Sequence, residues 1–233
     1  MTGTPTTSQA PQPLASRRHT FRFLLIVVGI AVAGLLRAGA TPAAAASPPP
    51  SRVPLYLSLV LLELALVWYV AIGVRRQGHS VFDLLGVRWR SWRDAGRDVA
   101  LAAGMALLLR GLSAALHWLA GPVHARTAFV LPRGIAESLL WVVVSLAAGA
   151  CEEAAFRGYL QPQLWALSGS LPAAILGQAL VFGVAHLYQG WRAALVTALY
   201  GLAFGVLAAW RRSIIPGILA HWLVDVVGGL VRR

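Results

Sequence analysis

The chain has 233 residues, of which 58% are hydrophobic and only 12% are charged. A soluble globular domain is about half apolar and about a quarter charged, so this composition excludes an ordinary soluble protein and indicates an integral membrane protein. The formal net charge is +12, and all 20 basic residues are arginine. Because these arginines separate apolar runs and do not gather on one amphipathic face, they indicate membrane topology, and we expect no nucleic-acid partner.

The amino-terminal part is expected to contain a tail and a first membrane anchor. Residues 1–20 are rich in Pro, Thr, Ser and Gln, which is typical of a disordered tail. Residues 21–52 hold an apolar run at about 23–36 and an Ala/Pro linker. A basic start, a short apolar middle and small residues after it also resemble a signal peptide, but the long preceding tail and Arg37 favour an uncleaved anchor.

Six further apolar runs follow, at about 53–74, 98–119, 135–156, 172–188, 193–210 and 213–231. Each approaches the roughly 20 residues that a helix needs to cross a bilayer. Long unbroken runs do not show the alternation of barrel strands. We therefore predict an all-α, polytopic transmembrane helix bundle with about seven spans, in which residues 53–233 form one membrane-embedded unit. The polar connector 81–97, with Trp89 and Trp92 among arginines, suits an interfacial helix.

The arginines also predict an orientation. Most of them fall on one side of the membrane if the amino terminus lies inside, as the positive-inside rule favours. Lysine and asparagine are absent, and the Arg/Ala-rich composition suggests a GC-rich bacterial genome. We expect the bacterial cytoplasmic membrane as the location. The single cysteine, Cys151, excludes an intramolecular disulfide and any CxxC zinc spacing, and we interpret it as a small packing residue.

Three short stretches place ionisable residues inside predicted spans: CEEAAFR (151–157), FGVAH (182–186) and HWLVD (221–225). Most other acidic residues and histidines are expected in connectors or near span ends. Ionisable groups inside a membrane are unfavourable, and they usually face a cavity and pair with one another. We therefore expect the three stretches to share one polar pocket.

Helical spacing refines this expectation for the two glutamates. Glu153 and Arg157 are four residues apart and can pair on one helix face. Glu152 is rotated by about 100° from Glu153, so one glutamate can be neutralised while its neighbour stays free for chemistry. A glutamate–arginine pair that only holds helices together is the alternative.

The other two stretches show the same spacing. Phe182 and His186 share one helix face, and His221 and Asp225 share another. The second pair can act together on one ligand, metal or reacting oxygen. The alternatives are a hydrogen-bonded core histidine at position 186 and an HxxxD spacing that arose by chance.

Taken in order, EExxxR, FxxxH and HxxxN/D on late transmembrane helices resemble the CPBP family of intramembrane metalloproteases. This family includes type II CAAX prenyl endopeptidases (Rce1-like) and bacterial relatives linked to bacteriocin processing or self-immunity (ABI). The resemblance covers about residues 135–231. It implies that Glu152 is the general base and activates a water with His186. It further implies that Glu153 and Arg157, with Phe182 in support, hold the geometry, and that His221 and Asp225 stabilise the oxyanion.

Position 225 departs from the commoner family pattern, in which many relatives have asparagine. An ionised carboxylate would repel an oxyanion, so Asp225 is expected to be protonated, to orient His221 or to bind a divalent metal. Our hypothesis is that His221 donates most of the stabilisation. The cofactor stays open between a divalent metal such as zinc and none, and the candidate metal ligands are Glu152, His186, His221 and Asp225.

The sequence therefore predicts an intramembrane endopeptidase that hydrolyses membrane-associated or lipid-modified, CAAX-like peptides with a glutamate-activated water. Its expected partners are a peptide or protein substrate and the lipid bilayer. One alternative is a non-enzymatic binding, immunity or scaffold protein that uses the same pocket. Another is a small transporter in which Glu152, Glu153 and Asp225 relay protons, although the chain has no evident internal repeat.

One geometrical conflict accompanies this prediction. With the spans above, Glu152 lies near one end of its helix and His186 near the opposite membrane face. The conflict disappears if the helix continues through FRGYLQPQLWAL (156–167), or if residues 158–171 fold back into the bundle. We favour the continuous helix.

Overall fold

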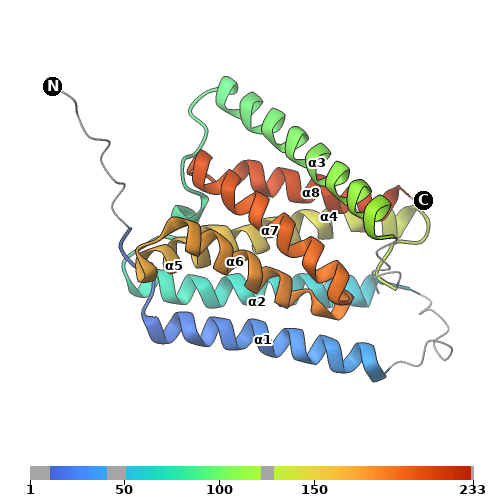
Figure 1. The fold of residues 1–233 in the computed structure, drawn as a ribbon, viewed down its shortest axis with the longest axis horizontal. Coiled ribbons are helices and arrows are strands. Elements are labelled where there is room, and N and C mark those ends of the chain that lie inside the picture. Colours follow the sequence, from blue (N-terminus) through green and yellow to red (C-terminus); the bar gives the residue numbers. More distant parts are fainter. Residues whose placement is uncertain (1–10, 41–50, 122–128, 232–233) are drawn as a thin grey trace.

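The computed structural model describes residues 11–40, 51–121 and 129–231. Within these ranges the protein is helical and has no strand, apart from an isolated bridge between Gly86 and Ser213. Figure 1 shows the helices as a bundle of elongated, adjacent rods. They are α1 (Arg17–Ala40), α2 (Val53–Arg76), α3 (Trp92–Ala120), α4 (Gly134–Glu152), η2 (Glu153–Leu160), α5 (Gln161–Ser168), α6 (Leu171–Ala185), α7 (Trp191–Arg211) and α8 (Ile215–Leu230), with short 3-10 helices η1 (Val81–Leu85) and η3 (Leu187–Gln189). The predicted all-α bundle is confirmed.

Five helical runs of the described chain are long and apolar enough to cross a membrane. The other two apolar helices, α6 with 15 residues and α8 with 16, are shorter. At about 1.5 Å per residue they reach about 22–24 Å, which is less than the ~30 Å hydrocarbon core. The predicted seven spans therefore correspond to five long helical runs and two short helices.

The glutamate helix is a single continuous run. Helices α4, η2 and α5 follow one another without a break and together cover Gly134–Ser168, 35 residues. Glu152 lies near the middle of this run. From Glu152 to Ser168 the helix extends about 24 Å along its axis. Helix α6 runs in the opposite direction for about 22 Å, so His186 at its end lies at nearly the same depth as Glu152. The favoured solution to the depth conflict is confirmed.

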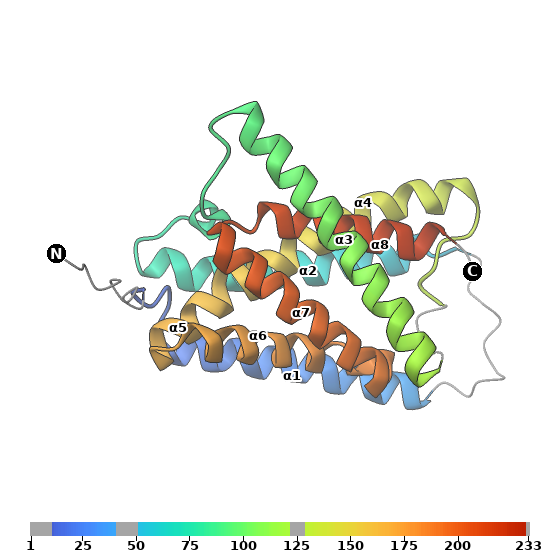
Figure 2. The same cartoon turned by 45° about the horizontal axis from the view of Figure 1, so that its top comes forward.

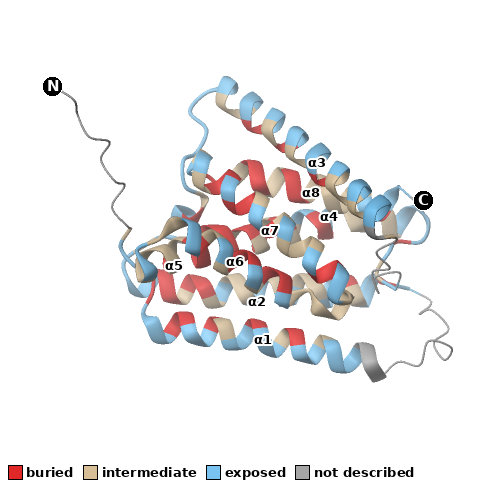
Figure 3. Ribbon diagram, viewed as in Figure 1, coloured by how far each residue is buried: buried red, intermediate tan, exposed pale blue. Residues whose placement is uncertain are grey.

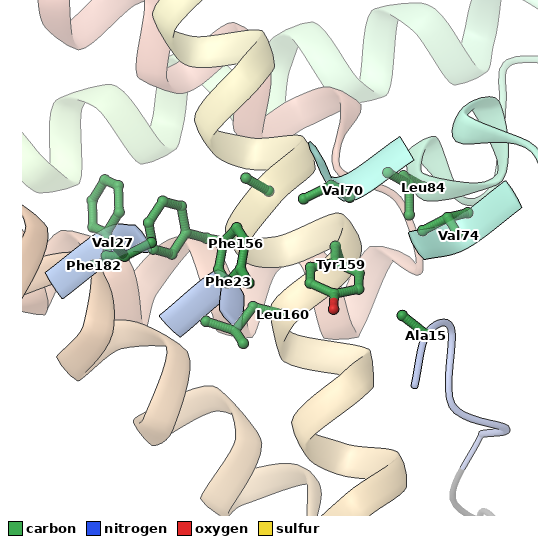
Figure 4. Close-up of a cluster of buried hydrophobic side chains, with 11 residues drawn as sticks. Ala15, Phe23, Val27, Val70, Val74, Leu84, Phe156, Tyr159, Leu160 and Phe182 are labelled. Atoms are coloured by element: carbon green, nitrogen blue, oxygen red, sulfur yellow. The ribbon is translucent and has the colours of Figure 1, made fainter. Parts of the chain in front are cut away.

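The middle part of this run is a π-helix, η2, and it is the best buried element of the bundle. A π-helix accommodates more residues per turn than an α-helix and occurs often at functional sites. Phe156, Tyr159 and Leu160 of η2 form an apolar cluster with Phe23 of α1 and Phe182 of α6 (Figure 4). Figure 3 shows buried residues concentrated along the central helices and few along α3. The central packing therefore lies immediately around the glutamates.

Helices α4 and α8 are joined tightly at two levels. The indole N–H of Trp141 donates to the backbone oxygen of Asp225 at 3.0 Å, and that of Trp222 donates to the oxygen of Val142 at 3.0 Å. Further along α4, a Cβ on Gly149 would lie 3.3 Å from the backbone of α8. The absence of a side chain at Gly149 lets the two helices, and the polar groups that they carry, approach closely.

Helix α3 runs obliquely across α8 at the edge of the bundle (Figure 2). It is held by Asp98, which is fully buried and binds Arg211 of α7 at 2.6 Å and the Trp89 indole at 2.9 Å. The interfacial helix expected over 81–97 is wrong. These residues form η1, a connection and the first turn of α3, which is capped by the Ser91 side chain. Because Ser91 caps the helix, α3 begins several residues before its apolar run.

The amino-terminal boundary also differs from the expectation. Helix α1 begins at Arg17, and the backbone N–H and oxygen of Ala15 bind the buried Gln163 side chain at 3.1 and 2.8 Å. The prediction of disorder over residues 1–20 is therefore wrong for its last part. The Gln163 side chain of α5 binds the backbone of Ala15, and α1 begins two residues later. The remainder of that segment, residues 1–10, and most of the Ala/Pro linker, residues 41–50, lie outside the described residues.

Candidate active site

Glu153, the first residue of the π-helix, organises the buried side of the site. Its carboxylate accepts a hydrogen bond from Arg157 at 2.8 Å, and both side chains are fully buried. The Arg157 guanidinium also lies 4.2 Å from the centre of the Phe182 ring. A carboxylate and a guanidinium that pair in this way neutralise each other inside the protein, and the aromatic face adds a cation–π contact. The predicted Glu153–Arg157 pair is present.

Glu153 also holds a histidine. One of its oxygens, Oε1, lies 3.2 Å from Nδ1 of His221 on α8. A Cβ on Gly217, one turn earlier on α8, would come within 2.9 Å of the other oxygen. Because position 217 has no side chain, α8 can approach the π-helix closely enough for this contact.

Glu152 lies on the open side of the same turn. Its side chain is 13% exposed, compared with 0% for Glu153. The Oε2 atom of Glu152 is 3.9 Å from Nε2 of His186 and 3.8 Å from Nε2 of His221. These separations are too long for direct hydrogen bonds, so a bridging group is needed to connect the Glu152 carboxylate with either ring. One glutamate is therefore neutralised and the other is available, as the helical spacing predicts.

His186 follows the last residue of α6 and caps that helix. Its Nδ1 lies 2.8 Å from the backbone oxygen of Phe182, and the two rings are 4.6 Å apart. A carbonyl oxygen only accepts, so Nδ1 carries the proton and donates. In the neutral ring, Nε2 is then an acceptor that faces Glu152. Phe182 thus fixes both the position and the tautomer of His186.

His221 is surrounded by carboxylates. Besides Glu153 at Nδ1 and Glu152 near Nε2, Asp225 places Oδ2 3.7 Å from Nε2. The Phe204 ring stacks on the imidazole with centroids 5.4 Å apart. Only a ring with a proton on each nitrogen can donate toward carboxylates on both sides. The surroundings therefore suit an imidazolium.

The structure thus brings the residues singled out in the sequence to one place. Glu152 and Glu153 come from the α4–η2 junction, His186 from the end of α6, and His221 and Asp225 from α8. Arg157 and Phe182 lie directly behind them. Cys151 is buried next to the site.

One residue of this site was missed in the sequence. Glu63 of α2 faces Glu152, and His221 and Asp225 also lie within its electrostatic reach. The signal was present, because Glu63 is a lone acidic residue near the middle of a 24-residue apolar helix. Unlike the ionisable residues of the last hundred positions, Glu63 has no ionisable neighbour within its helix with which it forms a recognisable motif. Tyr188 of η3, whose ring lies 6.1 Å from that of His186, was missed as well.

The donor set does not fit a metal ion. Within the described residues, no three His, Cys, Asp or Glu side chains are arranged to hold one. His221 also has carboxylates beside both of its ring nitrogens, and an imidazolium has no lone pair with which to bind a metal. The candidate metal ligands expected from the sequence therefore enter the proposed reaction through their own acid–base groups and not through a metal.

These features define a class of protein: an integral membrane protein of α-helices that encloses a glutamate–histidine site within the bundle. Residues 134–227 match the family model of the type II CAAX prenyl endopeptidase Rce1-like proteins. The match confirms the resemblance to the CPBP family over these residues. The matched region contains all three motifs. No curated protein and no solved structure matches the chain.

Proposed function

We propose that this protein is an intramembrane endopeptidase that cleaves lipid-modified, CAAX-like peptides at the membrane with a glutamate-activated water. The observation that supports it most directly is the position of Glu152 Oε2, 3.8–3.9 Å from the Nε2 atoms of two histidines that come from different helices. The family match supports the protease class.

The first step is the activation of water. A water between Glu152 and His186 donates one hydrogen bond to the carboxylate and one to the free Nε2 of the imidazole. As the water oxygen attacks the peptide carbonyl, Glu152 takes the proton and acts as general base. The backbone oxygen of Phe182 keeps the His186 ring in the tautomer that accepts from the water.

The second step is the stabilisation of the tetrahedral intermediate. His221 donates from Nε2 to the oxyanion, while Glu153 holds the ring through Nδ1. A donor directed at a developing oxyanion contributes about 10²–10³-fold to kcat in enzymes where it has been removed. Glu152 then returns its proton to the leaving amine, the C–N bond breaks, and a carboxylic acid and an amine leave.

The test uses purified protein in lipid vesicles and an internally quenched peptide that ends in a farnesylated CAAX sequence. The wild type is expected to cleave it, and Glu152→Gln and His186→Ala are expected to lower kcat by at least about 10²-fold because each loses one of the two acceptors of the water. His117→Ala, at an exposed position on α3, is the matched control and should keep wild-type activity.

Three results would overturn the proposal or a part of it. Unchanged cleavage by either site variant rejects the catalytic assignment. Absence of cleavage by the wild type, with binding of the peptide that survives Glu152→Gln, indicates a binding or immunity protein instead. Cleavage of the same peptide without its farnesyl group at an equal rate rejects selectivity for lipid-modified substrates.

A further inference from the structure

Glu63 occupies a position that needs an explanation. It lies near the middle of α2, which packs against α4 and η2, and its carboxyl group is directed at Glu152. An ionisable side chain at the centre of an apolar helix is unfavourable unless it has a partner or a function. None of the steps derived above uses Glu63.

The contacts of the two carboxyl groups show what is missing between them. Oε2 of Glu63 and Oε2 of Glu152 are both buried, and neither has a hydrogen-bond donor among the described residues. Two ionised carboxylates have only acceptors, so they cannot satisfy each other and they repel. A single proton between them makes one group a donor and removes both the repulsion and the two unpaired atoms.

Other charged groups around the pair do not supply that donor. His221 and Asp225 of α8, the Cys151 thiol and the Tyr188 phenol lie close enough to interact electrostatically with Glu63. His221 already faces Glu152, Glu153 and Asp225. The arginine of the site, Arg157, is bound to Glu153 on the far side of the π-helix.

We propose that Glu63 is a positioning residue for Glu152: the two carboxyl groups share one proton, and this hydrogen bond orients the Glu152 carboxylate toward His186 and His221. A carboxylate oxygen has two lone pairs, so Oε2 of Glu152 can accept from Glu63 and still accept from a water. This inference rests on the proposed function, because it assigns an orientation to the proposed general base.

The kinetic test compares Glu63→Gln with Glu63→Leu on the farnesylated peptide. The Gln amide keeps a donor of similar shape, so kcat should stay within about threefold of the wild type. Leu removes the donor, so the Glu152 carboxylate is no longer held in place. Because a small displacement of a catalytic group strongly lowers the rate, kcat should fall by about 10–100-fold, with KM within about twofold of the wild type. Leu64→Ala, at a half-exposed position beside Glu63 on α2, is the matched control.

A second measurement does not need a substrate. The infrared difference spectrum between wild type and Glu63→Gln at neutral pH should contain the carbonyl band of a protonated carboxyl group, and so should the difference between wild type and Glu152→Gln. Either change replaces one carboxyl group by an amide donor and removes the need for the shared proton.

The outcomes separate this inference from the proposed function. Wild-type kcat in Glu63→Leu, equal loss in Glu63→Gln and Glu63→Leu, or no carboxyl band in the difference spectra each overturns the positioning role. If Glu152→Gln keeps full activity, the proposed function fails, while the infrared band still decides whether the two carboxyl groups share a proton.

Discussion

The imidazole of His221 has carboxylates on both of its nitrogens, and Asp225 is the most exposed of them. The Asp225 side chain is 34% exposed, compared with 13% for Glu152 and 0% for Glu153. It approaches Nε2 of His221 without forming a hydrogen bond. In this position Asp225 favours the doubly protonated ring, which can then donate to an oxyanion. The carboxylate that would repel the oxyanion directly is partly screened by solvent.

At this scale we predict the effect of Asp225→Asn. If His221 supplies most of the oxyanion stabilisation, Asp225→Asn should keep kcat within about threefold of the wild type, whereas His221→Ala should lower it by about 10²–10³-fold. The measurement is steady-state cleavage of the farnesylated peptide in vesicles. Loss of activity in Asp225→Asn together with its retention in Asp225→Glu would show that position 225 needs a carboxylate, and the hypothesis for His221 would fail.

Among the elements, the approach of α8 to the π-helix decides where the buried glutamate lies. Seven of the eight residues of η2 are buried, including Glu153 and Arg157. The Glu153 carboxylate fits under α8 because Gly217 has no side chain, and it meets His221 one turn further along. The hydrogen bond between Glu153 and His221 therefore depends on the close approach of the α8 backbone to η2.

This contact predicts different effects for two alanine substitutions in α8. In Gly217→Ala the new methyl group would lie 2.9 Å from Glu153 Oε2. The carboxylate must move away from His221, and we expect kcat to fall by about tenfold or more. Gly228→Ala is the control, because a Cβ there meets nothing within 4 Å while the gain in helix propensity is the same. Equal kcat in the two variants would contradict this role of Gly217.

The whole molecule combines five long helical runs with two short helices, and the two short helices, α6 and α8, carry the site histidines. A helix of 15 or 16 residues ends before it has crossed the hydrocarbon core, so the polar groups near such helices lie closer to water. The partial exposure of Asp225 agrees with access of water to the site. The hydrolytic reaction proposed here requires such access.

The orientation in the membrane remains a prediction at this scale. With the amino terminus inside, Gln77 after α2 faces the inner side and Ser51 before α2 faces the outer side. Cys151 is buried, so single cysteines can be introduced at these two exposed positions and labelled with a membrane-impermeant thiol reagent in intact bacterial cells. Ser51→Cys should react in intact cells and Gln77→Cys only after permeabilisation. The reverse pattern would establish the opposite orientation.

Local patterns predicted much of this protein because they act over a few residues. Apolar runs of span length predicted the helices, and the spacing of Glu153 to Arg157 and of His221 to Asp225 predicted pairs that are present. Capping changed the boundaries: the Ser91 side chain begins α3 before its apolar run, and Gln163 holds the backbone at Ala15. Both interactions involve polar groups to which hydropathy is insensitive.

The sequence by itself determined the helical membrane bundle and the three polar motifs, because hydropathy and helical periodicity are properties of neighbouring residues. Only the tertiary structure decided that the helix after Glu152 continues as a π-helix, that α6 returns His186 to its level, and that Glu63 joins the site from α2. The physical reason is that these contacts link residues 34 to 89 positions apart. Their formation depends on how whole helices pack, and the close approaches at Gly149 and Gly217 control that packing.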